Sequence, residues 1–191
     1  VVLMDAIKTA YATAYTRLLL LVKSGAIGKV VSVDATCTSL MGTVPADKLV
    51  DRWNSITAWG PTALLPVFQI LGTEYIDKHI FSQYLDKEKK FDGFTKIDFI
   101  YPEAVASIKV AKAAKSEGNL VITGTEGYIY VPAPWWKTDY FEVKYENQNM
   151  NKRLFYQLEG EGIRYELVAF SKAIESGKNS SYVSEEVSVG I

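Results

Sequence analysis

Cysteine and histidine are almost absent from this chain of 191 residues. Because Cys37 is the sole cysteine, no internal disulfide can form, which is typical of proteins from a reducing compartment. Because His79 is the sole histidine, a zinc site would have to be built almost wholly from carboxylates, which suit zinc poorly. We therefore expect no metal site. Cys37 should be a small core residue, and His79 a structural or solvent-exposed one.

Long apolar runs and an excess of charge of one sign are also missing. The apolar run at residues 18–22 is far shorter than the roughly 20 residues that span a bilayer. No basic segment precedes an apolar core at the N-terminus, so no signal peptide is visible. The formal net charge is −1, which predicts neither nucleic acid nor an anionic membrane as a partner. These features together favour a cytoplasmic protein.

The two ends of the chain lie within patterned sequence. It begins VVLMDA, without an initiator methionine, and stops in VSVGI. We interpret the sequence as a fragment of a longer protein. Its composition, 48% hydrophobic and 23% charged, is that of an ordinary globular protein and predicts a single domain over residues 1–191.

The periodicity of apolar residues predicts an α+β fold. Helical spacing is found over residues 11–24 and 161–176, and a further helix is expected over 62–71, with Pro61 in its first turn. Alternating or β-rich runs predict strands over 1–4, 30–39, 75–83, 96–101, 104–111, 120–123, 128–131, 140–145 and 153–158. Tight turns join most of these strands. We therefore expect an open, mostly antiparallel sheet with helices packed on one face, and a second face left for solvent or a partner.

Two segments superficially suggest phosphate sites. Lys87, Lys89 and Lys90 alternate with acidic residues in DKEKK, which predicts a solvated turn. The run GTEG at residues 124–127 lacks the spacing of nucleotide-binding loops and joins strand to strand, so it offers no helix N-terminus to an anion. A hairpin turn is the better interpretation.

Aromatic residues at one end of the predicted sheet, together with an arginine, are the best candidates for a binding surface. Such a set suits a hydroxylated or anionic small molecule. It suits a subunit interface equally well, and packing in the core is the third alternative. The residues concerned are Arg52, Trp53, Trp59, Tyr130, Trp135 and Trp136.

Four segments together resemble a known family. They are LMDAIKTAYATAYTRLLLLVKSGAIGKVVSVDATCTS, GPTALLPVFQILG, GTEGYIYVPAPWW and EGEGIRYELVAFSKAIESGK. In this order they resemble the C-terminal domain of the Gfo/Idh/MocA oxidoreductases, the glucose–fructose oxidoreductase and inositol dehydrogenase superfamily. The resemblance implies a parent protein with an N-terminal Rossmann domain that binds NAD or NADP, and residues 1–6 would be the last strand of that domain. It also implies a carbohydrate-like substrate and a homo-oligomer formed through the open sheet face.

The chain departs from the family's pattern in two places. It contains neither a glycine-rich dinucleotide fingerprint nor the Glu-Lys-Pro motif with the catalytic lysine, so we expect it to bind no cofactor by itself. When Gly60 and ALLP are aligned with the family, the acidic position falls on Ala58 and the His/Tyr position on Thr62. Alanine cannot transfer a proton, and the threonine hydroxyl has no useful pKa near neutrality. Asp51 lies upstream, but we assign no catalytic residue to this chain.

Two interpretations remain open. In the first, the chain is the substrate-binding and oligomerisation half of an NAD(P)-dependent oxidoreductase that acts on a sugar, an inositol or a related polyol. Its substrate contacts would then come from Arg52, Trp53, Thr62, Trp135 and Trp136. In the second, the chain is a catalytically degenerate binding or dimerisation module of the same fold within a larger protein.

Overall fold

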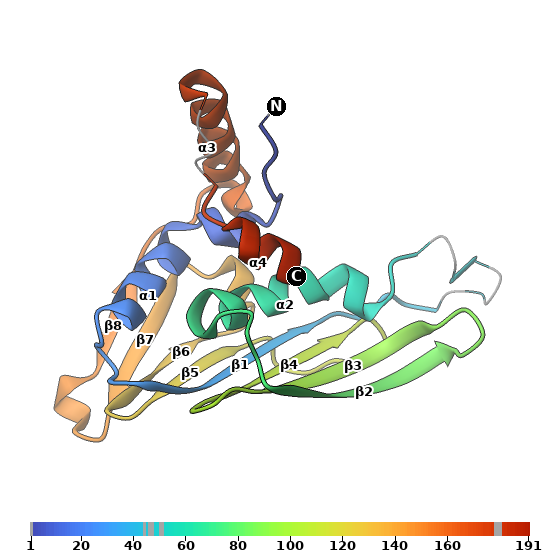
Figure 1. The fold of residues 1–191 in the computed structure, drawn as a ribbon, viewed down its shortest axis with the longest axis horizontal. Helices are drawn as coiled ribbons and strands as arrows, with labels where there is room; N and C mark the ends of the chain where they lie inside the picture. Colours follow the sequence, from blue (N-terminus) through green and yellow to red (C-terminus); the bar gives the residue numbers. More distant parts are fainter. Residues whose placement is uncertain (1, 44, 46–47, 50–51, 178–180) are drawn as a thin grey trace.

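The framework of the protein is one sheet of eight strands. A computed structural model describes residues 2–43, 45, 48–49, 52–177 and 181–191. The strands are β1 (Val30–Thr38), β2 (Asp77–Asp86), β3 (Phe91–Ile100), β4 (Val105–Ala111), β5 (Leu120–Gly124), β6 (Gly127–Val131), β7 (Tyr140–Tyr145) and β8 (Lys152–Phe155). Their order is β2-β3-β4-β1-β5-β6-β7-β8, as Figure 1 shows. β1 pairs with β4 in parallel, and the other neighbouring pairs are antiparallel. The predicted α+β fold with an open, mostly antiparallel sheet is confirmed.

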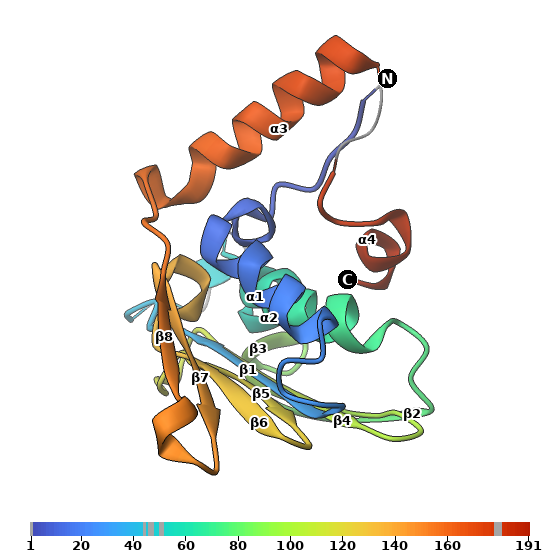
Figure 2. The ribbon, with the colours of Figure 1, turned by 90° about the vertical axis from the view of Figure 1, so that its left-hand side faces the viewer.

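The described helical segments lie on one side of this sheet, except for one short 3-10 turn in the hairpin between β7 and β8. They are η1 (Lys8–Tyr11), α1 (Thr13–Lys23), α2 (Ser55–Leu71), η3 (Trp135–Lys137), η4 (Gln148–Met150), η5 (Gly160–Gly162), α3 (Ile163–Ser176) and α4 (Glu185–Gly190). α1 and α2 pack on the sheet, and α4 packs on α2 (Figure 2). Helix α1 buries Tyr15, Leu18 and Val22 as its spacing predicts. It ends where Gly25 takes a φ of +77°, a conformation that glycine adopts without strain.

Helix α2 begins earlier than the sequence predicts. It starts at Ser55 rather than at residue 62, because the Asn54 side chain caps it by accepting a hydrogen bond of 2.9 Å from the Thr57 amide. Pro61 and Pro66 therefore lie inside the helix. An interior proline costs about 3 kcal/mol. Burial of the apolar face of α2 against β1, β3 and β4 offsets this cost.

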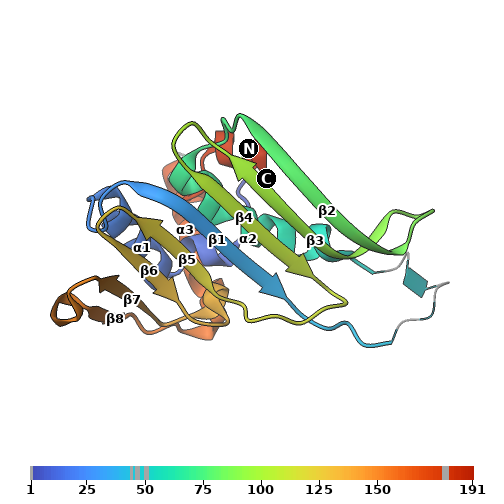
Figure 3. The ribbon, with the colours of Figure 1, turned by 90° about the horizontal axis from the view of Figure 1, so that it is seen from below.

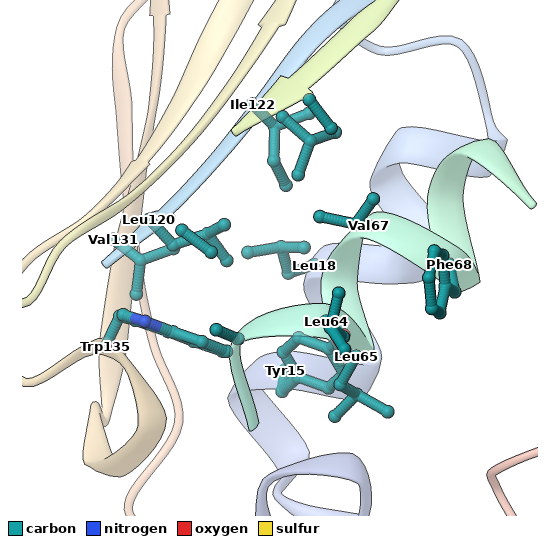
Figure 4. Close-up of a cluster of buried hydrophobic side chains, with 14 of the residues drawn as sticks. Tyr15, Leu18, Leu64, Leu65, Val67, Phe68, Leu120, Ile122, Val131 and Trp135 are labelled. Atoms are coloured by element: carbon teal, nitrogen blue, oxygen red, sulfur yellow. The ribbon is translucent and has the colours of Figure 1, made fainter. Parts of the chain in front are cut away.

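The main core lies between α1, α2 and the sheet. Figure 4 shows its centre, where side chains from both helices meet those of the central strands. The labelled residues are Tyr15, Leu18, Leu64, Leu65, Val67, Phe68, Leu120, Ile122, Val131 and Trp135, all of them buried. Nonlocal packing of this kind is the dominant source of stability in a mixed domain.

Two terminal segments differ from their predictions. Residues 2–7 form no regular element, and Leu3 is 85% exposed, so the strand predicted over 1–4 does not form within the described part of this chain. No described strand pairs with that segment, and its role as the last strand of another domain stays a prediction. Helix α3 forms as predicted but projects away from the sheet (Figure 2). It buries Ala169 and Ala173, whereas its large apolar residues Leu167 and Ile174 are each 57% exposed.

The GTEG segment forms the predicted hairpin turn between β5 and β6. The turn also packs against the connection from α1 to β1: Thr125 donates its amide to the Lys29 carbonyl at 2.9 Å, and Glu126 donates to the Ile27 carbonyl at 3.0 Å. A Cβ atom on Gly124 would lie 2.1 Å from the Ile27 carbonyl oxygen. Glycine is therefore required here by close backbone approach.

The face of the sheet opposite α1 and α2 is not covered by any described helix, as the view from below shows (Figure 3). The strand register places Asp98, Asp34, Tyr130, Glu142 and Arg153 in one row across this face. Hydrogen bonds from Lys144 and Arg153 lower the pKa of Glu142. Exposed aromatic side chains flank the charges, including Phe81 and Phe155, each 64% exposed. This open face thus mixes paired charges with aromatic surface.

Cys37 is expected to be inert toward thiol reagents in the folded protein. Its side chain is fully buried on the helical face of β1, and burial raises the pKa of its thiol. Because the thiolate is the reactive form, labelling requires both access and deprotonation. Ellman's reagent should react with one thiol per chain in denaturant and at a rate limited by opening of the fold in its absence. Rapid labelling of the native chain at neutral pH would contradict this placement.

Candidate functional site

A cavity of about 400 Å³ brings together several of the residues singled out in the sequence. Its described lining consists of Met41, Arg52, Trp53, Ala58 and Lys112. Arg52 and Trp53 come from the segment before α2, Ala58 from the first turns of α2, Met41 from the segment after β1, and Lys112 from the residue after β4. The position aligned with the family's acid therefore lines the same cavity as two predicted substrate residues. A cavity of this size accommodates a small molecule.

A buried polar network holds the wall of this cavity in place. Ser55, the first residue of α2, donates to the Asp92 carbonyl at 3.0 Å and accepts from the Lys112 amide at 3.0 Å. The Asp92 carboxylate accepts from the Thr95 hydroxyl at 2.7 Å and from the Ile56 amide at 3.5 Å. A carboxylate at a helix N-terminus interacts favourably with the helix dipole and satisfies a free amide. The network therefore fixes the start of α2 against the ends of β3 and β4.

Ser55, Asp92, Met41 and Lys112 were not singled out in the sequence. The sequence could have indicated Asp92, because a carboxylate inside the apolar segment FDGF has to be hydrogen-bonded when it is buried. The sequence near Lys112 could not have indicated it. Lys112 and Arg52 line the same cavity only because the fold brings β4 and the segment before α2 together.

The loop between β6 and β7, which carries Trp135 and Trp136 and is called the Trp-Trp loop below, places one tryptophan in the core and the other nearer the surface. Trp135, predicted as a substrate contact, is only 2% exposed, and its indole Nε1 donates to the Thr36 carbonyl at 3.1 Å. It also packs beside Tyr15, with ring centroids 6.2 Å apart. As a correction to that prediction, the Trp135 side chain belongs to the core and presents no surface to a ligand.

Trp136 is half-buried and packs on Trp59, with ring centroids 4.8 Å apart. Trp59 in turn donates its indole Nε1 to the Ser39 hydroxyl at 3.0 Å. The ring of Trp136 also covers Gly118, where an added Cβ would lie 2.8 Å from it. Trp59 follows Ala58 in α2, so this aromatic pair packs on the helix that carries Ala58, outside the described lining of the cavity.

The remaining candidates lie outside the described lining of the cavity. Thr62 is half-buried one helical turn beyond Ala58, on the same side of α2. Tyr130 lies on the open sheet face and donates its hydroxyl to Glu117 at 3.1 Å. The predicted ligand surface is thus split into a cavity, an aromatic support and a residue of the open face.

The lysine-rich turn and His79 both lie at the edge of the sheet. Lys87 and Lys90 are exposed in the hairpin between β2 and β3, as predicted for a solvated turn. The exposed His79 ring lies on edge strand β2, with its Nε2 3.7 Å from Asp77. Within the described ranges, no group of three His, Cys, Asp or Glu side chains is placed to hold a metal ion. None of the helices in those ranges is both long enough and apolar enough to cross a membrane.

Comparison with known proteins shows similarity only at the level of structure. No family model matches the sequence, and no curated protein matches it. Levoglucosan dehydrogenase in complex with NADH and levoglucosan matches 99% of this chain with a TM-score of 0.79 and 18% identity. The 3-ketoreductase KijD10 from Actinomadura kijaniata, with NADP and TDP-benzene, matches 100% with a TM-score of 0.76 and 12% identity. An oxidoreductase from Agrobacterium radiobacter, with NAD+, L-tartaric acid and magnesium, matches 93% with a TM-score of 0.68 and 18% identity.

These similarities identify the class of fold. The chain shares the fold of the matched part of these oxidoreductases, which agrees with the predicted resemblance to the C-terminal domain of the Gfo/Idh/MocA family. It spans 56–60% of the length of the three structures described above. At identities below 20% the similarity concerns the fold and does not by itself assign an activity.

Proposed function

We propose that this chain is the substrate-binding and oligomerisation domain of an NAD(P)-dependent oxidoreductase that acts on a sugar, an inositol or a related polyol. The observation that carries the proposal is the position of Ala58 beside Arg52 and Trp53 in one cavity. In the family alignment, Ala58 falls at the position of an acidic residue that acts on the substrate. The cavity that Ala58 lines is therefore the expected place for the substrate. The fold supports the same assignment, since levoglucosan dehydrogenase and KijD10 share it.

The nicotinamide cofactor would be bound by another domain of the parent protein. The described sheet is mostly antiparallel, and its parallel pair, β1 and β4, is not joined by a single crossover helix with a glycine-rich turn. A dinucleotide site of the Rossmann type requires that arrangement. The described residues of this chain therefore form no dinucleotide site of the Rossmann type, and we expect the chain to bind no NAD or NADP by itself.

In this proposal the chain binds and orients the substrate. Arg52 and Lys112 supply hydrogen-bond donors, and Trp53 supplies an apolar wall. Trp136 supports the cavity through Trp59, and Thr62 contributes a hydroxyl further along α2. Ala58 cannot hold or release a proton, so the proton that leaves the substrate hydroxyl would be taken by a group from outside this chain.

The second candidate function is a catalytically degenerate binding or dimerisation module. The specific observation in its favour is that Ala58 lines the cavity at the place of the expected acid. A parent protein of this kind would bind a carbohydrate-like molecule without oxidising it.

The decisive experiment is a substrate screen with the complete protein in which this chain occurs. We expect reduction of NAD+ or NADP+ with at least one sugar, inositol or polyol, and a fall in kcat/KM of about ten-fold or more in Arg52→Gln, because a charged hydrogen bond is worth roughly 1.5–3 kcal/mol. Binding of a sugar without turnover would favour the degenerate module. If the complete protein neither binds nor converts any of these molecules, both candidate functions are refuted.

A second measurement tests oligomerisation through the open sheet face. We expect sedimentation velocity at micromolar concentration to show a species larger than the 21.3 kDa monomer. A charge introduced at Tyr128, which is 41% exposed on β6, should shift the equilibrium toward monomer. A monomer at all concentrations would contradict this part of the proposal.

A further inference from the structure

We infer that the ligand of the cavity beside Ala58 carries an oxyanion, a phosphate or a carboxylate, attached to its sugar or polyol ring. The inference rests on the proposed function and narrows its substrate class. Its basis is the charge in the cavity: among the described lining residues there are two cations, Arg52 and Lys112, and no carboxylate.

Within the described part of the chain, the two cations of the cavity differ from several other basic residues in forming no ion pair. Neither the Arg52 nor the Lys112 side chain forms an ion pair with another described residue. By contrast, Lys29 pairs with Glu103, Lys96 with Asp98, Arg153 with Glu142 and Arg164 with Glu159. In a chain of net charge −1, two positive groups that face one cavity without an ion pair among the described residues raise the local concentration of anions.

The two groups also come from separate elements that the fold holds together. The Lys112 amide donates both to Ser55 in α2 and to the Gly93 carbonyl at 3.1 Å, and the Lys112 carbonyl accepts from the Met41 amide at 2.9 Å. The backbone at Lys112 is therefore fixed relative to the start of α2, three residues after Arg52. A guanidinium and an ammonium carried by neighbouring backbone segments suit a tetrahedral or planar oxyanion, which accepts several charge-assisted hydrogen bonds at once.

The rest of the cavity suits the ring of such a ligand. The Trp53 side chain is 73% exposed, and an indole with its face in solvent is available for an apolar ring surface. Met41 and Ala58 add apolar lining without a competing charge. A volume of about 400 Å³ leaves room for a monosaccharide with one anionic substituent.

The test compares charged and neutral sugars on the 191-residue chain. D-glucose 6-phosphate, D-glucuronate and D-glucose are titrated at constant ionic strength, with the indole N–H signal of Trp53 as the NMR readout. We expect at least one charged sugar to bind about ten-fold or more tightly than glucose, which corresponds to roughly 1.4 kcal/mol. The preferred one of the two identifies the oxyanion as phosphate or carboxylate.

Matched variants connect the preference to the cavity. Arg52→Gln and Lys112→Gln should each reduce the affinity for the charged sugar toward that for glucose, whereas Arg17→Gln in α1 and Lys172→Gln in α3 should not. Arg52→Lys, which keeps the charge but loses the planar fork, should lie between. Circular dichroism checks that each variant is folded.

Two negative outcomes differ in meaning. If glucose binds as tightly as both charged sugars, or if the charged sugars keep their affinity in Arg52→Gln and Lys112→Gln, the oxyanion inference is wrong while the carbohydrate site stands. If no sugar shifts the Trp53 signal, the proposed substrate site is itself wrong, and the inference falls with it.

Discussion

Replacing Trp135 by alanine is expected to destabilise the chain by about 3–5 kcal/mol. The side chain is 2% exposed and lies among core residues of α1 and the sheet, so its removal leaves a large cavity. The hydrogen bond from its indole to the partly buried Thr36 carbonyl, 3.1 Å long, is also lost. Urea denaturation followed by far-ultraviolet circular dichroism measures the change in the free energy of unfolding.

Trp53→Ala is the matched control, because it removes the same side chain from the surface. With 73% of Trp53 exposed, the expected change in the free energy of unfolding is within about 0.5 kcal/mol. Trp135→Phe keeps most of the volume and should cost less than the alanine variant. Equal losses in Trp135→Ala and Trp53→Ala would show that Trp135 is not a core residue.

Asp92→Ala is expected to cost about 2–4 kcal/mol, with part of the loss in the candidate site. The carboxylate is 3% exposed, and its removal takes acceptors from the Thr95 hydroxyl and the Ile56 amide. An unsatisfied buried group costs about 1–3 kcal/mol, and loss of a negative charge at a helix N-terminus adds roughly 0.3–1 kcal/mol. Thermal and urea unfolding give the loss, and sugar binding measured on the folded protein reports the effect on the cavity.

Two controls separate the causes of this loss. Asp34→Ala removes an exposed carboxylate of β1 that accepts only from the neighbouring Ser32 hydroxyl among the described residues, so stability should change by no more than about 0.5 kcal/mol. Asp92→Asn keeps one of the two acceptor oxygens and replaces the other with an NH2 donor, so it should cost less than Asp92→Ala. If Asp92→Ala is as stable as Asp34→Ala, the network under α2 does not anchor the helix.

Local sequence patterns predict a helix or strand well where burial of one face is the main interaction that forms it. The alternation in β1 and the spacing in α1 follow from burial of one face, which the chain encodes residue by residue. The predicted start of α2 is wrong because Pro61 is a strong local signal for a first turn, whereas the Asn54 cap and the packing of the whole helix outweigh it. For α3 the sequence predicts the helix correctly, but the large apolar residues at helical spacing are exposed. It does not indicate that the small residues Ala169 and Ala173 are the ones buried.

In the candidate site too, the sequence predicts some of the residues and tertiary packing decides the others. Alignment on Gly60 selects Ala58 and Thr62, and the pairing of aromatic residues with an arginine selects Arg52 and Trp53, and both follow from the order of residues along the chain. The sequence does not indicate which of the two tryptophans of the Trp-Trp loop is buried. The packing of the loop on Gly118 and Thr36 decides that Trp135 enters the core and Trp136 does not.

By itself, the sequence determined the α+β class, the hairpin turns and the resemblance to an oxidoreductase domain, because each depends on periodicity, turn residues or motifs over short spans. Only the tertiary structure decided that Lys112 joins Arg52 in one cavity and that Asp92 lies beneath it. These residues are brought together by sheet register and by the packing of α2. Such contacts between distant segments leave no periodic trace in the chain.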